Sequence, residues 1–175
     1  MKQTVCCFSG YRPEKMPPHM QEGSPNFIEM MQSLRHAILR AAECGYTVFL
    51  SGMSRGFDLW AAEAVLDLQQ SNPDLQLWAL LAFHGMEQHW EPEWQTRYTS
   101  VLRRARHTFS VCDRYEPGCY MRRDAELVAR SSRCICYFTG TPGGTEYTVQ
   151  RAHRAGLDIV NLADGQLSLF DSFPL

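Results

Sequence analysis

The residues best suited to chemistry in this sequence lie in short glycine-rich segments that follow apolar runs. Segment 51–58, Ser-Gly-Met-Ser-Arg-Gly-Phe-Asp, places Gly52 and Gly56 directly before a helix-like stretch. Unpaired N–H groups and the helix dipole at such a position favour an anion. Asp58 could cap the first helical turn, or it could accept hydrogen bonds from a ribose hydroxyl. The residues predicted to bind a ligand here are Ser51, Gly52, Arg55, Gly56 and Asp58.

A second segment of this type, 139–148, has the sequence Thr-Gly-Thr-Pro-Gly-Gly-Thr-Glu-Tyr-Thr. The pair Gly143-Gly144 removes side chains where a phosphate would approach the backbone, and Thr145 offers a hydroxyl that could cap the following helix. A plain turn would have the same composition, but two such segments in one short chain favour a shared ligand. The residues predicted to bind it here are Gly140, Gly143, Gly144 and Thr145.

A third segment, Ser-Gly-Tyr-Arg-Pro at 9–13, follows the first apolar run of the chain. Gly10 allows close backbone approach, and the guanidinium of Arg12 suits a phosphate or a carboxylate. An ordinary strand end with an exposed arginine is the alternative. We include Gly10 and Arg12 among the predicted ligand-binding residues.

The elements that must position these segments alternate along the chain. Strand-like runs are predicted at 4–9, 47–51, 75–83, 108–111, 134–138 and 159–162, and helical periodicity at 27–44, 57–70, 94–105, 121–131 and 145–155. This alternation predicts an α/β fold, a Rossmann-like three-layer sandwich with a mostly parallel central sheet and helices on both faces. Ligands of such sheets bind beyond the carboxyl ends of the strands. One domain is predicted over 1–163, a tail over 164–175, and a long functional loop over 10–25.

Composition limits the classes of partner. The 175 residues carry a formal net charge of -2, without the basic excess typical of a non-specific nucleic-acid binder. The seven cysteines lie mostly in apolar runs and are predicted to be buried free thiols of a cytoplasmic protein. His84, His89 and Cys119 match no standard zinc spacing, so no metal site is predicted. No run is long enough to cross a membrane. The oligomeric state stays open, and a homo-oligomer is compatible with the sequence.

Several aromatic residues are candidates for the core and for a binding site alike. Trp90 and Trp94 could stack on a base, although packing beneath a loop is the more common role of such residues. For Tyr98, Tyr115 and Tyr120 the two roles are equally compatible with the sequence.

Taken together, these segments resemble the SLOG superfamily of Rossmann-like proteins, and in particular its YpsA-like branch. Segment 9–13 looks like that branch's Thr-Gly-His-Arg-Pro opening, and 51–58 is similar to a glycine-rich signature shared with the DNA-processing protein DprA. Cys119-Tyr120, Arg123-Asp124 and Gly143-Gly144-Thr145 complete the likeness. The resemblance implies a ligand of the nucleoside phosphate, NAD or ADP-ribose class and a role as a sensor or regulator, with Arg123 adding positive charge.

The Lonely Guy enzymes of the same superfamily hydrolyse nucleoside 5′-monophosphates with an arginine and a glutamate. The resemblance therefore offers Arg123 and Glu146 as catalytic candidates of a nucleotide N-glycosidase. Thr148 stands where those enzymes have their glutamate, and Glu146 lies at another angle around the helix. Binding is therefore better supported than catalysis. A DNA-metabolism adaptor related to DprA is a third alternative.

The tail contains a peptide, Gln-Leu-Ser-Leu-Phe at 166–170, that resembles the motif by which bacterial proteins dock on the DNA sliding clamp. Leu169 and Phe170 would fill an apolar pocket of the clamp, with Gln166 and Leu167 completing the motif. The alternative is that these residues fold back onto their own domain.

Overall fold

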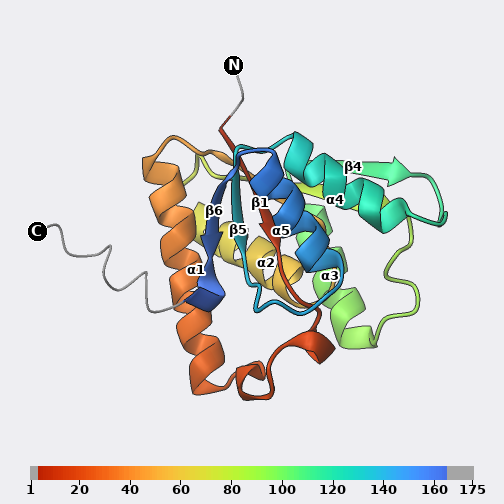
Figure 1. Cartoon of the computed structure of the whole chain (residues 1–175), viewed down its shortest axis with the longest axis horizontal. Helices are drawn as coiled ribbons and strands as arrows, with labels where there is room; N and C mark the ends of the chain where they lie inside the picture. The colour runs from red at the N-terminus through yellow and green to blue at the C-terminus, as the bar shows by residue number, and fades with distance from the viewer. Residues whose placement is uncertain (1–3, 165–175) are drawn as a thin grey trace, which may run out of the picture.

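A six-stranded, entirely parallel sheet forms the centre of the computed structural model, which describes residues 4–164 (Figure 1). Its order is β4-β3-β2-β1-β5-β6. The strands are β1 (Val5–Ser9), β2 (Val48–Ser51), β3 (Gln76–Phe83), β4 (His107–Cys112), β5 (Arg133–Cys136) and β6 (Asp158–Asn161). All five residues of β1 are buried, because helices cover both faces of the sheet at its centre.

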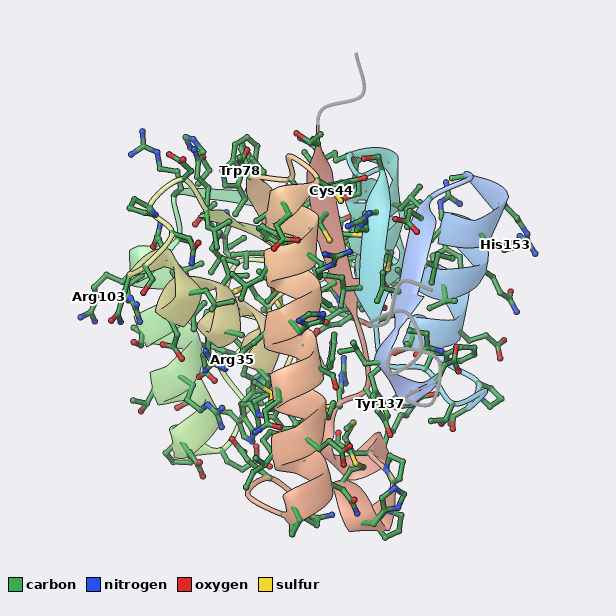
Figure 2. The ribbon with its side chains drawn as sticks, turned by 90° about the vertical axis from the view of Figure 1, so that its left-hand side faces the viewer. Arg35, Cys44, Trp78, Arg103, Tyr137 and His153 are labelled. Atoms are coloured by element: carbon green, nitrogen blue, oxygen red, sulfur yellow. The ribbon has the colours of Figure 1, made fainter. Side chains whose placement is uncertain are left out.

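Three helices cover one face of the sheet and two cover the other. The first set is α1 (Pro25–Glu43), α2 (Phe57–Gln69) and α3 (Pro92–Arg104), which pack side by side, and the second is α4 (Cys119–Ala129) and α5 (Gly144–Arg154). Figure 2 shows the layers edge-on, with α3 on one side of the strands and α5 on the other. Strands β2, β3 and β4 follow one another outward on one side of β1. The chain then crosses back, and β5 pairs with the other edge of β1. Right-handed crossovers therefore place α4 and α5 on the opposite face. This confirms the predicted three-layer fold.

The core is divided by the sheet into two apolar clusters. The larger one joins the strands to α1, α2 and α3, and includes the fully buried Leu34 and Ile38 of α1. The smaller one contains Leu127 and Val128 of α4 and Ala152 of α5. All seven cysteines are free, and six of them are buried, with only Cys44 exposed. The thiols therefore serve as small apolar side chains of the core.

The helix boundaries follow local signals in the sequence. Ser24 caps α1, because its hydroxyl accepts a hydrogen bond from the Phe27 N–H at 3.2 Å, and Pro25 occupies the first helical position. The helices α1 and α5 end just before Gly45 and Gly156, where the sequence predicts stops. No helix within residues 4–164 has the length and apolar character needed to span a membrane.

The segment between β1 and α1 is an ordered loop with two 3-10 turns, η1 (Pro13–Lys15) and η2 (Pro18–Met20). The buried side chains of Tyr11, Met16 and Met20 anchor this loop to the protein. A last 3-10 turn, η3 (Leu162–Asp164), follows β6. The clamp-like peptide at 166–170 lies outside the described residues.

Candidate functional site

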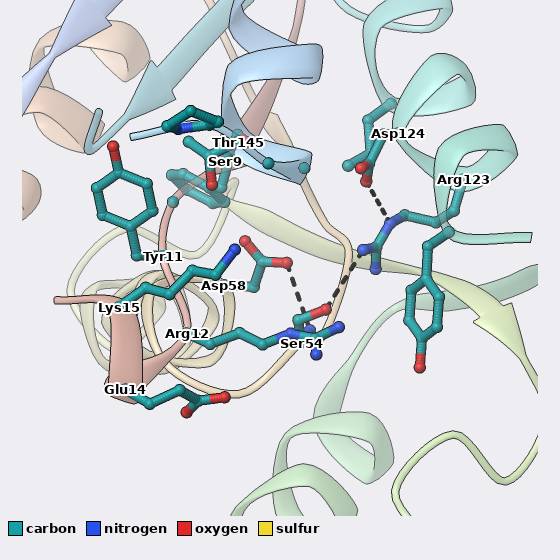
Figure 3. A pocket seen from close by; sticks show the side chains of 17 residues that line it. Ser9, Tyr11, Arg12, Glu14, Lys15, Ser54, Asp58, Arg123, Asp124 and Thr145 are labelled. Carbon is teal, nitrogen blue, oxygen red and sulfur yellow. Dashed lines mark hydrogen bonds and ion pairs between the residues drawn. The ribbon is translucent and has the colours of Figure 1, made fainter. Parts of the chain in front are cut away.

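A cavity of about 330 Å³ opens at the carboxyl ends of the strands, between the loops that follow β1 and β5 (Figure 3). These two strands are neighbours in the sheet, and the order of strand addition reverses between them. Ligands of open α/β sheets bind at this kind of topological switch point. The lining also includes residues of the β2–α2 loop, α2 and α4. The cavity therefore collects residues from four separate parts of the chain.

Glycines allow the loops after β1 and β2 to interlock. A β-carbon at Gly10 would lie 2.3 Å from Cγ of Phe57, the first residue of α2. Gly56 has φ +82°, and a β-carbon there would lie 2.5 Å from the Tyr11 carbonyl oxygen. The Phe57 N–H donates to that same oxygen at 3.1 Å. Gly10 and Gly56, which the sequence suggests as ligand contacts, thus have a packing role between the two loops.

The β2–α2 loop is held by its own hydrogen bonds. Ser51 Oγ donates to the Asp58 carbonyl at 3.0 Å and accepts from the Met53 N–H at 3.1 Å. The Ser54 N–H donates to the Asp58 carboxylate at 3.3 Å. Met53 has φ +63°, a left-handed backbone conformation that such residues rarely adopt. The loop is therefore preorganised, with Ser54 and Asp58 toward the cavity and Ser51 beneath it.

Arg123 of α4 is a buried anchor of this loop. It is 5% exposed, and its guanidinium donates to the Gly52 carbonyl, to Asp124 Oδ1 at 2.7 Å and to Ser54 Oγ at 3.3 Å. Burial alone would lower its pKa, but the carboxylates of Asp124 and Asp58 raise the pKa of Arg123 above its ordinary value. Its donors are largely used within the protein, so this arginine mainly fixes the geometry of the cavity wall.

Asp58 is a carboxyl group with an unusual environment. It is 6% exposed and lines the cavity. Burial raises the pKa of Asp58 from 3.8 to about 6, against the opposing effect of Arg123, and the negative charge of Asp124 adds to the increase. The group can therefore accept hydrogen bonds when ionised and donate one when protonated.

Two further cations reach the cavity from the turn η1. Figure 3 shows Arg12 and Lys15 extending toward Ser54 and Asp58. Among residues 4–164, neither forms an ion pair with a carboxylate, whereas the intervening Glu14 pairs with Arg55 at 2.9 Å. The Arg12 guanidinium instead lies 5.5 Å from the centre of the Tyr120 ring. These free positive charges are available to an anionic ligand.

The N-terminus of α5 meets Lys15 across the cavity. A β-carbon at Gly143 would lie 2.9 Å from Lys15 Nζ, so the ammonium group stands directly over this turn. Gly143 is the N-cap and provides no side-chain hydrogen bond to the first N–H groups of the helix. Thr145, expected to cap the helix, is already its second residue, 8% exposed and facing the cavity. The first turn therefore keeps donors for an anion.

Tyr11 ties this turn to the loop after β1. Its phenolic oxygen accepts hydrogen bonds from the N–H groups of Thr139 at 2.8 Å and Thr141 at 3.2 Å. Burial opposes ionisation of Tyr11, but these hydrogen bonds dominate and lower the pKa of the hydroxyl. The shape of the glycine-rich segment before α5 thus depends on a residue more than a hundred positions earlier.

Only some of the sequence-predicted residues line the cavity. Arg55 does not line it and pairs with Glu14, which does, and with Glu91, which does not. Glu146 lies on α5 and is not part of the lining. Predicted residues that do line it are Gly10, Arg12, Asp58, Arg123, Gly143, Gly144 and Thr145, whereas Ser51, Gly52, Gly56 and Gly140 do not. The sequence did not suggest Lys15, Ser9 or Ser54 as site residues. Within the described chain, no group of three or more metal-ligating side chains is present.

Comparison with known families shows the family of the chain. A sequence model described as the YspA SLOG family matches residues 6–158. The chain belongs to this family. UPF0398 proteins of Bacillus cereus strain B4264 and Bacillus thuringiensis strain Al Hakam are each 26% identical over 155 residues, covering 87% of this chain and 84% of each relative.

Among solved structures, DNA processing proteins share the fold. The Streptococcus pneumoniae protein matches with a TM-score of 0.61 and 14% identity over 98% of this chain and 57% of its own. The Helicobacter pylori protein, described as binding single-stranded DNA, matches with a TM-score of 0.60 and 12% identity over 95% of this chain and 72% of its own. This chain thus spans little more than half of the Streptococcus protein, and the likeness concerns the fold.

Proposed function

We propose that the cavity binds a phosphorylated ligand of the nucleotide kind, such as a nucleoside phosphate, NAD or ADP-ribose, and that the protein acts as a sensor or regulator. The observation that carries this proposal is the pairing of Lys15 with the uncapped N-terminus of α5, in a cavity that the buried Asp58 also lines. The cavity thus offers cations and free helix N–H groups to an anion, and a carboxyl group to a hydrogen-bond donor.

The phosphate is assigned to the turn of α5 in preference to that of α2. At α2 the Phe57 N–H is taken by the Tyr11 carbonyl and the Ser54 N–H by the Asp58 carboxylate. The negative charge of Asp58 at the start of α2 would also repel a phosphate once this group is ionised. At α5, the nearby Asp124 carboxylate, 3.7 Å from where a β-carbon of Gly144 would stand, is already paired with Arg123 at 2.7 Å. Lys15 adds a positive charge to the helix dipole there, and Arg12 is a second cation that lines the cavity.

The sugar is assigned to the side of Asp58. A buried carboxylate gains most from a partner that donates hydrogen bonds, and the hydroxyl groups of a ribose are such donors. Ser54 lies beside it as a further polar group. The cavity volume of about 330 Å³ is at the lower end of the range for small-molecule sites, about 300–1,000 Å³, and suits one nucleotide unit.

The hydrogen bonds of Arg123 and the position of Glu146, the two catalytic candidates, favour binding over N-glycosidase chemistry. Arg123 already serves Gly52, Asp124 and Ser54, and Glu146 does not line the cavity. A hydrolase would need at least one of them free to reach the scissile bond.

A ligand panel tests the proposal. Thermal unfolding is followed with adenosine 5′-monophosphate, ADP-ribose, NAD, ribose 5-phosphate and unphosphorylated adenosine. A ligand present at about 100 times its Kd adds about 2.7 kcal/mol to the folded state, which corresponds to about 5–10 °C in Tm for a chain of this size. We expect such a shift with at least one phosphorylated compound and none with adenosine.

Two variants show whether the thermal shift depends on the cavity. Lys15→Ala should abolish most of the shift, whereas Arg103→Ala, which removes an exposed cation of α3, should leave it intact. A flat response across all phosphorylated compounds would contradict the proposal.

A further inference from the structure

Three aromatic rings form a continuous group at the carboxyl ends of β3 and β4, which we name the aromatic shelf. Phe83 is the last residue of β3, Tyr115 lies between β4 and α4, and Tyr120 belongs to the first turn of α4. The Phe83 ring contacts Tyr115 edge-on at 5.6 Å between centroids and Tyr120 edge-on at 5.8 Å. The shelf is thus built by β3, the β4–α4 connection and the first turn of α4.

The shelf runs directly into the cavity. Tyr120 lines the cavity, and the Arg12 and Arg123 guanidinium groups lie 5.5 and 5.7 Å from its ring centre. At the other end of the shelf Tyr115 is 62% exposed, the highest value among the four exposed large apolar side chains of the described chain. Tyr120 is therefore the member of the shelf that a ligand in the cavity would meet first, beside the Arg12 guanidinium.

The order of the strands places these groups in a row. The N-terminus of α5 follows β5, Lys15 and Arg12 follow β1, and Asp58 follows β2, while the shelf stands at the ends of β3 and β4. Since adjacent strands lie about 4.8 Å apart, the sequence of groups along this edge is anion site, hydroxyl acceptor, aromatic surface. A nucleotide has its phosphate, sugar and base in that same order.

We infer that the aromatic shelf of Tyr115, Phe83 and Tyr120 holds the base of the ligand by stacking. This inference rests on the proposed function, because the phosphate and the sugar must occupy the cavity for the base to reach the shelf. Stacking uses the π-face that every base possesses, so the shelf favours a nucleotide over a sugar phosphate and discriminates little among bases. Purines, with their larger rings, bind more tightly than pyrimidines.

The test compares a ligand that has a base with one that lacks it. Isothermal titration measures Kd for adenosine 5′-monophosphate and ribose 5-phosphate with the whole chain. The unmodified protein should bind the nucleotide at least about tenfold more tightly than the sugar phosphate. Tyr115→Ala should remove about tenfold of the nucleotide affinity and leave ribose 5-phosphate unchanged, and Tyr115→Phe should retain the original Kd.

A matched control is Phe109→Ala, which removes a 39% exposed ring from the edge strand β4. Because both truncated side chains are exposed, neither variant should unfold the protein. Equal affinities of the unmodified protein for the two ligands would overturn the shelf and leave the phosphate site standing. An equal loss of both ligands in Tyr115→Ala would overturn it as well. Absence of binding by both ligands would overturn the shelf, whereas the proposed function is decided by the full panel of phosphorylated compounds.

Discussion

Replacing Asp58 by asparagine removes a buried charge while keeping the shape of the side chain. The amide oxygen can still accept the Ser54 N–H that the carboxylate accepts at 3.3 Å. The substitution therefore resembles a permanently protonated Asp58. Because burial raises the pKa of Asp58 to about 6, ionising this group costs free energy in the folded protein. We expect Asp58→Asn to stabilise the fold near neutral pH.

The size of the gain follows from the two pKa values. One pKa unit corresponds to about 1.4 kcal/mol, so an increase from 3.8 to about 6 costs about 3 kcal/mol when the group is fully ionised. Between these values the folded state binds more protons than the unfolded chain, so stability falls as pH rises from about 4 to about 6. The advantage of the variant should be about 3 kcal/mol at pH 7.5 and less than about 1 kcal/mol at pH 4.

Urea unfolding at these two pH values measures the difference. Carboxyl groups remote from Asp58 titrate alike in both proteins and cancel in the comparison. Asp74→Asn, at an exposed position, should change stability by less than about 0.5 kcal/mol at either pH. A destabilised Asp58→Asn at pH 7.5, or a gain that does not depend on pH, would refute the reasoning.

Three further predictions concern packing, chemistry and the tail. Gly10→Ala should lower the free energy of unfolding by about 1–3 kcal/mol, because its β-carbon would overlap the Phe57 ring. Unchanged stability in urea unfolding would show that the loops after β1 and β2 can separate freely. Incubation with nucleoside monophosphates should release no free base by chromatography, whereas release that disappears in Glu146→Gln would assign the protein to the N-glycosidases. Immobilised bacterial sliding clamp should capture the chain through the peptide at 166–170, and Phe170→Ala should lower capture about tenfold. Equal capture of the unmodified chain and Phe170→Ala would exclude this peptide as the contact.

The layout of the fold could be predicted from periodicity alone. All six strands and five helices occur where the apolar patterns indicate, with boundaries that differ by a few residues. Burial on both faces makes strands such as β1 continuously apolar, and helix stops such as Gly45 are local signals. The expected position of the site at the carboxyl ends of the strands follows from the fold class.

The identities of the cavity residues were harder to predict, because they depend on contacts distant in sequence. Arg55 pairs with Glu91, 36 positions away, and so does not turn into the cavity. Lys15 lies in the cavity together with Arg12 because residues three apart share one side of a 3-10 turn, and the sequence alone did not indicate that turn. The uncapped first turn of α5 likewise depends on where the helix begins, which sequence patterns determine only to within a few residues.

The affinity of one phosphorylated ligand for two variants tests the central claim most directly. Isothermal titration with the compound that gives the largest thermal shift is performed on the unmodified protein, Lys15→Ala and Arg103→Ala. We predict that Lys15→Ala weakens binding at least about tenfold, since a charge-assisted hydrogen bond contributes about 1.5–3 kcal/mol, and that Arg103→Ala leaves Kd unchanged. The same Kd in all three proteins would contradict a phosphate site between Lys15 and the N-terminus of α5.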